Sequence, residues 1–353
     1  MKFIIVILII GVLFFSLIQI LPIAGENRDN SGFLASAASF LNDYLDVEKE
    51  IKGIISVVDK EDFKESIIYF NKKINIFDIK FFPHNQKTVF AASDRGLFVS
   101  RDEGLNWKSF SDKENKINAK TEVYKILFGS SGQAFLSVFQ NNKGIIYQSQ
   151  DDFLSLRKIL EFTGAAANNF DIFENNLYIG LSDGKLILYS LDNQSFRILN
   201  NFNSGIIGLK VGTEGLIYLT LKDGGFYASK NSGQSFERMK FLDDFSGADK
   251  ISDFSVNLNQ PAEIYAATDY GLIRSQDSGM TWQVFKSLPT EEKTISILAI
   301  GESNEIFMAD YDRIYKSRDK GKNWQILYPE IEDGREISIM AVKGEKIIVG
   351  SKE

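Results

Sequence analysis

The chain has 353 residues, with 40 Lys and Arg against 47 Asp and Glu, a net charge of −7 and a pI near 5.1. It contains no Cys and a single His, which excludes disulfide frameworks, thiolate nucleophiles and metal sites built from Cys or from several His side chains. The acidic balance argues against nucleic-acid binding, because a surface that follows phosphates is basic. We therefore predict no nucleic-acid partner, and no cofactor or metal-ligand set is assigned. Metal dependence stays open, because Asp and Asn side chains near turns can bind calcium weakly.

The first 25 residues are predicted to be a signal anchor. Residues 3–21 carry no charge and follow the single cation Lys2. As a helix, this run would be roughly 28 Å long, close to the hydrocarbon thickness of a bilayer. A cleaved signal peptide is the alternative, although the best cleavage site, after Ala24, has Pro22 at position −3. Both interpretations place the following residues outside the cytoplasm, either anchored to a membrane or secreted.

Residues 26–52 are predicted to be a linker with one amphipathic helix. From 30 to 52, apolar residues recur largely at i, i+3, i+4 and i+7, which is the spacing of one helix face. This segment would act as a spacer that covers a domain edge, or as an oligomer contact.

Beyond residue 50 the sequence repeats the pattern S-x-[DN]-x-G-x-x-[WF]. The four copies are Ser100, Asp102, Gly104 and Trp107; Ser229, Asn231, Gly233 and Phe236; Ser275, Asp277, Gly279 and Trp282; and Ser317, Asp319, Gly321 and Trp324. Two degenerate copies, at Asp151 and Asp192, lie between the first and second of these. The mean spacing is about 43 residues, a period typical of four-stranded propeller blades.

Each position in the repeated pattern has a physical role in a turn between two strands. Ser and Asp side chains hydrogen-bond to backbone groups a few residues further on and close the turn. Gly supplies the positive φ that a tight turn requires. The aromatic residue begins the next strand and is expected to lie back across the turn.

The pattern resembles the Asp-box, or BNR, repeat of β-propellers. This family includes the photosystem II stability/assembly factors and the N-terminal propeller of sortilin-type receptors, with xyloglucanases and the more distant sialidases among its enzymes. The resemblance covers about residues 53–350 and implies a propeller. It leaves function open, because enzymes and non-enzymes share this turn.

Residues 53–353 are predicted to form one all-β domain, a seven-bladed β-propeller, since this length holds about seven repeats of that period. Segments 337–342 and 346–350 look like the first two strands of a blade. Residues 53–59 with Phe63 match the spacing of Gly96 to Asp102 and look like the second half of a blade. We predict that both chain ends build the last blade together, which removes open sheet edges.

No catalytic residues are predicted. A sialidase-like site would need an arginine triad, and the family marks its first Arg with an F-R-I-P motif. The similar string around Arg197 lacks the Pro, so Arg197 is expected on an outer strand. A xyloglucanase-like cleft would need two propellers. His84, beside Pro83, is expected to be a solvated turn residue.

Acidic turns between the second and third strands of successive blades are the candidate binding site. These turns should emerge on one face of a propeller. The candidate residues are Asp94, Arg95, Asp183, Asp223, Asp269, Tyr270, Asp312 and Arg313, with Tyr311 beside them. They would form a docking face for a basic segment or a cation, unless Asp-Gly is present only as a favoured hairpin turn.

The sequence thus favours a non-catalytic, extracytoplasmic protein-binding or scaffolding module on a membrane-anchored propeller. The alternative is a glycan-directed protein, either hydrolase-like or lectin-like, which would place exposed aromatics and paired carboxylates in a central pocket. A third interpretation is a structural surface component that multimerises through residues 31–51.

Overall fold

The computed structural model describes the following residues: 55–58, 66–68, 74–85, 87–129, 132–212, 215–239, 245–257, 259–285, 288, 295, 297–301, 303–329, 331, 334–344 and 346–353. The chain divides into two units, Met1–Lys49 and Glu50–Glu353, and every described residue belongs to the second.

The described residues form seven four-stranded antiparallel sheets, which we call blades. Blades 1 to 3 contain β3 (Ile76–Phe81), β4 (Val89–Ser93), β5 (Gly96–Ser100) and β6 (Trp107–Phe110); β7 (Glu122–Phe128), β8 (Ala134–Gln140), β9 (Lys143–Ser149) and β10 (Arg157–Thr163); and β11 (Asn169–Phe173), β12 (Asn176–Gly180), β13 (Lys185–Ser190) and β14 (Ser195–Asn201).

Blades 4 to 6 continue this arrangement along the chain. They contain β15 (Ile206–Val211), β16 (Ile217–Leu221), β17 (Phe226–Ser229) and β18 (Glu237–Arg238); β19 (Ile251–Val256), β20 (Ile264–Thr268), β21 (Gly271–Ser275) and β22 (Gln283–Val284); and β23 (Ile297–Ile300), β24 (Ile306–Asp310), β25 (Arg313–Ser317) and β26 (Gln325–Leu327).

Six blades are thus built from four consecutive strands, and the seventh is composite. Blade 7 has the order β27 (Glu336–Lys343), β28 (Lys346–Lys352), β1 (Ile55–Val58) and β2 (Ser66–Ile68). β1 pairs antiparallel with β28, with Ile55 opposite Gly350. The two ends of the described chain therefore complete one sheet.

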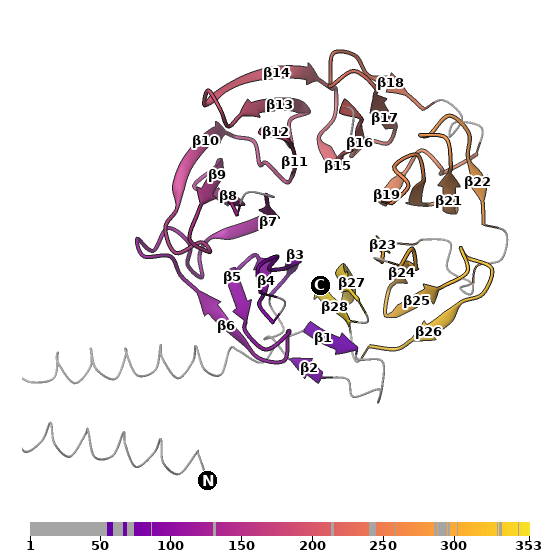
Figure 1. Cartoon of the computed structure of the whole chain (residues 1–353), viewed down its shortest axis with the longest axis horizontal. Helices are drawn as coiled ribbons and strands as arrows, with labels where there is room; N and C mark the ends of the chain where they lie inside the picture. Colours follow the sequence, from indigo (N-terminus) through magenta and orange to yellow (C-terminus); the bar gives the residue numbers. More distant parts are fainter. Residues whose placement is uncertain are drawn as a thin grey trace, which may run out of the picture. The chain divides into compact units, whose positions relative to one another are not determined.

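The blades form a closed ring, viewed along its axis in Figure 1. The first strand of each blade contacts the first strand of the next, from β3 through β7, β11, β15, β19 and β23 to β27, and β27 contacts β3. This closed circle of sheets makes the fold an all-β β-propeller.

The part of the fold that the structure describes contains no α-helix, which corrects the predicted fold class. None of the segments that the structure describes is α-helical, and none forms a helix long and apolar enough to cross a membrane. The predicted transmembrane segment 3–21 and the predicted amphipathic helix within 30–52 lie outside the described residues. The described fold is therefore a propeller built only from strands and their connections.

The hydrophobic core lies between neighbouring blades. The second strands β4, β16, β20 and β24 are buried along their whole length, as expected for apolar strands covered on both faces. Aromatic rings join adjacent blades: Phe90 of blade 1 meets Phe153 of blade 2 at 5.2 Å between ring centroids, and Phe226 of blade 4 meets Trp282 of blade 5 at 5.7 Å. This packing holds the loops at the two ends of the blades in fixed positions.

Candidate protein-binding face

The turns between second and third strands lie at the same end of the blades as the segments that lead into the first strands. The backbone shows this directly, because Asp94 N donates to Asn75 O at 3.1 Å and Asp269 N donates to Lys250 O at 3.2 Å. The same contact recurs in blade 4, between Lys222 N and Gly205 O at 2.8 Å. We call this end, with turns 94–95, 182–184, 222–225, 269–270 and 311–312, the turn face.

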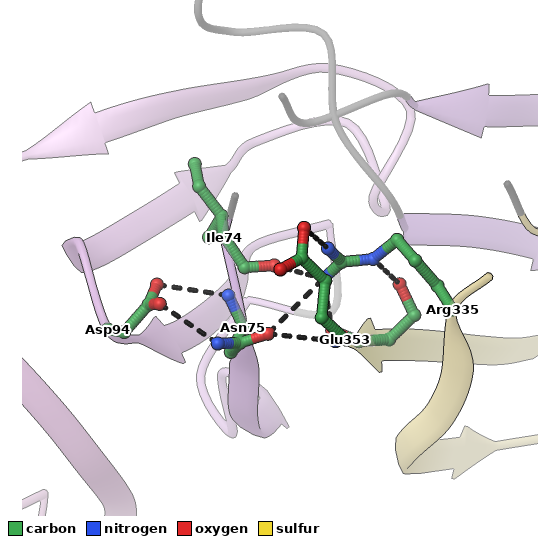
Figure 2. Close-up of polar contacts among 6 residues, drawn as sticks. Ile74, Asn75, Asp94, Arg335 and Glu353 are labelled. Atoms are coloured by element: carbon green, nitrogen blue, oxygen red, sulfur yellow. Dashed lines mark hydrogen bonds and ion pairs between the residues drawn. The ribbon is translucent and has the colours of Figure 1, made fainter. Parts of the chain in front are cut away.

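The carboxylate of Asp94 is occupied within the fold. Its two oxygens accept hydrogen bonds from the backbone N of Asn75 at 3.0 Å and from Asn75 Nδ2 at 3.1 Å (Figure 2). Burial raises the pKa of the Asp94 carboxyl, against these hydrogen bonds and Arg95, which lower it. Asn75 Oδ1 in turn accepts a hydrogen bond from the backbone N of Glu353 at 3.1 Å. Asp94 therefore supports the closure of the ring.

Arg335 completes this closure, as Figure 2 shows. Its side chain is 3% exposed and donates hydrogen bonds to the carbonyl of Ile74, to Ser351 Oγ at 3.1 Å and to Ser351 O at 3.2 Å. An ion pair of 3.5 Å joins Arg335 to Glu353. One buried guanidinium thus ties the end of β28 to the residues that enter β3.

The other predicted carboxylates of the turn face reach solvent. Asp183 forms an ion pair with Lys185, Asp312 Oδ1 lies 3.5 Å from Arg313 Nε, and Asp223 and Arg95 are exposed. Exposed ion pairs of this kind contribute little to stability and are screened by salt. These carboxylates are therefore accessible to a charged partner.

Two tyrosines occupy equivalent turns of neighbouring blades on this face. Tyr270 of blade 5 is 39% exposed and Tyr311 of blade 6 is 52% exposed. The Tyr270 ring lies 5.3 Å from the ring of Phe245, between centroids. Next to Tyr270, a cavity is lined by Phe245, Ser246, Gly247, Asp249, Lys250 and Asp269. Tyr combines a large apolar surface with a polar tip, which suits protein interfaces.

The four repeated segments lie at the opposite end of the blades and close turns there, as the sequence predicts. Ser100 Oγ accepts a hydrogen bond from Gly104 N at 2.8 Å and donates one to Asp102 Oδ1 at 2.8 Å. The indole of Trp107 donates to the Gly104 carbonyl at 2.7 Å. The Ser and Asp or Asn contacts recur in the copies that begin at Ser229, Ser275 and Ser317. These residues therefore have a structural role.

His84 and Arg197, for which no catalytic role is predicted, lie where the sequence places them. His84 is exposed in the turn between β3 and β4. Arg197 lies on β14, the outermost strand of blade 3. Within the described ranges, no group of three or more His, Cys, Asp or Glu side chains is placed to hold a metal ion.

Charged residues around the central axis were missed by sequence reasoning. Asp78 on β3 accepts a hydrogen bond from Ile126 N of β7 at 2.9 Å, and Asp253 makes the same link from β19 to Leu298 N of β23 at 3.0 Å. Each carboxylate thus joins the first strands of two blades. Asp171 does so between β11 and β15. The signal was visible in the sequence as an Asp before an apolar residue in alternate first strands.

Lys125 lies among these carboxylates, with its Nζ 3.8 Å from Asp78 Oδ2. Burial lowers the pKa of the Lys125 ammonium to about 8, with Asp78 opposing the shift and Lys80 and Lys210 adding to it. Charges from several blades therefore meet near the axis.

Comparisons with known proteins agree with this fold. YCF48 from Cyanidioschyzon merolae is similar with a TM-score of 0.63 and 14% identity, over 80% of this chain and 94% of that one. YCF48 bound to D1 peptide is similar with a TM-score of 0.62 and 12% identity, over 84% and 94%. The likeness shows a β-propeller.

A third similar structure is the extracellular domain of BT4673 from B. thetaiotaomicron, with a TM-score of 0.59 and 13% identity, over 79% of this chain and 37% of that one. No protein-family model matches the chain, and no curated protein matches it in sequence. The comparisons therefore describe the fold of this chain and leave its function to the site.

Proposed function

We propose that this chain is a non-catalytic, extracytoplasmic protein-binding or scaffolding module that receives a protein partner on its turn face. The observation that carries the proposal is the exposure of Tyr270 and Tyr311 in equivalent turns of neighbouring blades, next to Asp269 and Asp312. The rings offer rigid contact area, and the carboxylates select the charge of the partner. YCF48, a similar propeller, is bound to a peptide in one structure, which supports a protein partner.

Two finer points belong to the same proposal. The uncharged apolar run at residues 3–21 supports export of the chain from the cytoplasm. The Ser, Asp or Asn and Gly hydrogen bonds shared by the four repeated segments support their assignment as Asp-box turns.

The test compares two pairs of substitutions in the full chain used as bait against surface and membrane extract of the source cells. The double variant Tyr270→Ala/Tyr311→Ala removes the exposed rings of the turn face. The matched control Leu105→Ala/Met280→Ala removes exposed apolar side chains, 43% and 64% exposed, at the opposite end of the blades. We expect the wild type and the control to retain the same protein. The tyrosine variant should retain at least tenfold less of it.

A second variant, Asp223→Asn/Asp269→Asn/Asp312→Asn, tests the role of charge. We expect it to weaken capture of the same protein and to make capture less sensitive to salt. Asp94 is left intact because its carboxylate holds Asn75. Equal retention by every variant, or recovery of polysaccharide in place of protein, would count against the proposal.

A further inference from the structure

The outer edge of blade 3 is the most exposed apolar strand edge among the described blades. β14 pairs on one side with β13 and is the terminal strand of its sheet. Phe196 is 58% exposed and Ile198 is 54% exposed, and alternation along a strand places both on the same face. The strand thus offers unpaired backbone groups next to two accessible apolar side chains.

Two cross-strand rows of apolar side chains end at this edge. In the first row, Leu177 lies opposite Tyr189, which lies opposite Phe196. The second row ends at Ile198, opposite Ile187. Tyr189 is 3% exposed and Ile187 is 2% exposed, so each row runs from the covered core into solvent. One more strand beside β14 would continue both rows and cover their ends.

The outer edges of other blades are protected against such pairing. In blade 2, β10 carries Lys158 and Glu161, which form an ion pair. In blade 1, Trp107 and Phe110 of β6 are buried. The outer strands β18 and β22 are only two residues long. Charge, coverage and shortness are the usual ways to block edge pairing, whereas β14 has seven residues and one charged side chain, Arg197.

We propose that β14 binds an extended segment of a partner protein by strand addition. The segment would carry apolar residues at alternate positions, opposite Phe196 and Ile198, and an acidic residue between them to complement Arg197. A second copy of β14 fits less well. Antiparallel pairing that matches Phe196 with Ile198 would place Arg197 opposite Arg197, and like charges directly opposite one another are destabilising.

The test uses a capped synthetic peptide of alternating valine and glutamate, with a valine–lysine peptide for comparison, and the full chain. We expect the glutamate peptide to bind the wild type more tightly than the lysine peptide does. Phe196→Ser/Ile198→Ser should weaken binding at least tenfold, while the control Met280→Ser, which also removes an exposed apolar side chain, should not change it. Arg197→Glu should reverse the preference between the two peptides.

Three outcomes would overturn the proposal. The first is equal binding of a peptide whose alternate amides are N-methylated, since such a peptide cannot extend the sheet. The second is no binding of either peptide at millimolar concentration. The third is a wild-type dimer that the serine variant converts to a monomer, which would assign the edge to a second copy. The variant Tyr270→Ala/Tyr311→Ala should bind the peptide like the wild type, because the turn face is a separate site.

Discussion

The turn between the last two strands is built differently in blade 1 and blade 3. In blade 1, Ser100 lies opposite Trp107 across the hairpin, and the indole of Trp107 is 3% exposed. In blade 3, Ser190 lies opposite Ser195, so the loop is two residues shorter, and the following Phe196 is 58% exposed. Both blades have an aromatic residue after the turn, but only the longer loop covers it.

Loop length and glycine explain this difference. Gly104 has φ 96°, a backbone conformation that favours glycine, and its amide reaches Ser100 Oγ while its carbonyl accepts the Trp107 indole. In the shorter loop of blade 3, Gln194 takes the positive φ, at 54°. The spacing of the repeat therefore decides whether the aromatic side chain becomes core or surface.

The largest effect should come from removing the aromatic side chain. Trp107→Ala should lower the free energy of unfolding by about 3–5 kcal/mol, because it empties a buried site. Phe196→Ala should change it by no more than about 0.5 kcal/mol, since most of that side chain is already in water. Urea unfolding of both variants measures the difference, and similar losses would refute this account of the two turns.

A smaller effect is expected from the serine that closes the longer turn. Ser100→Ala should cost about 1–3 kcal/mol of stability, because the buried amide of Gly104 loses its acceptor. The matched control is Ser195→Ala on the exposed edge of blade 3, which should have almost no effect. Thermal unfolding can rank the two variants, and a larger loss in the control would contradict the prediction.

The smallest effect should appear in the acid dependence of stability. Hydrogen bonds from the backbone amide and side chain of Asn323 lower the pKa of Asp319 to about 2, and those from Thr281 lower the pKa of Asp277. A carboxyl whose pKa is lower in the folded state than in the unfolded state, where it is near 3.8, stabilises the fold at pH values above the unfolded-state pKa. This stabilisation is lost as the pH falls through the folded-state pKa.

Asp277→Asn/Asp319→Asn should therefore lose less stability than the wild type when unfolding is measured between pH 4 and pH 2. The repeat supplies the reverse experiment in blade 4, where Asn231 already occupies this position and accepts a hydrogen bond from Ser235 N at 2.9 Å. Asn231→Asp should make the acid dependence steeper. If the pH dependence of stability were unchanged in both variants, protonation of these turn residues would have no effect on folding.

Much of the fold could be predicted because the repeated turn has a short-range physical cause. The hydrogen bonds of Ser100 and the positive φ of Gly104 depend on neighbours within four residues, so the sequence pattern carries them. The exposure of Phe196 could not be read from its residue type, because it follows from a loop length that only the strand pairing reveals.

The candidate site was only partly predictable for a similar reason. The turn pattern places Asp94 and Asp269 on one face. Nothing in the pattern shows that Asp94 would be taken up by Asn75, which precedes the first strand of the same blade. Asp78 itself follows a visible pattern, but its partner could not be predicted, since that partner is the backbone amide of Ile126 in the next blade. The sequence pattern could not predict these two contacts, because each joins different strands or blades.

The composite seventh blade also determines the order in which the blades can fold as the chain is synthesised. β1 is translated early, yet its neighbour β28 lies near the end of the described chain, with Ile55 paired to Gly350. Among the strand pairings of the described residues, this one joins the positions farthest apart in the sequence, and it carries a large loop-closure entropy. We expect the six blades of consecutive strands to form as they leave the ribosome, while β1 and β2 wait for β28. Closing the ring would then be the slow final step of folding.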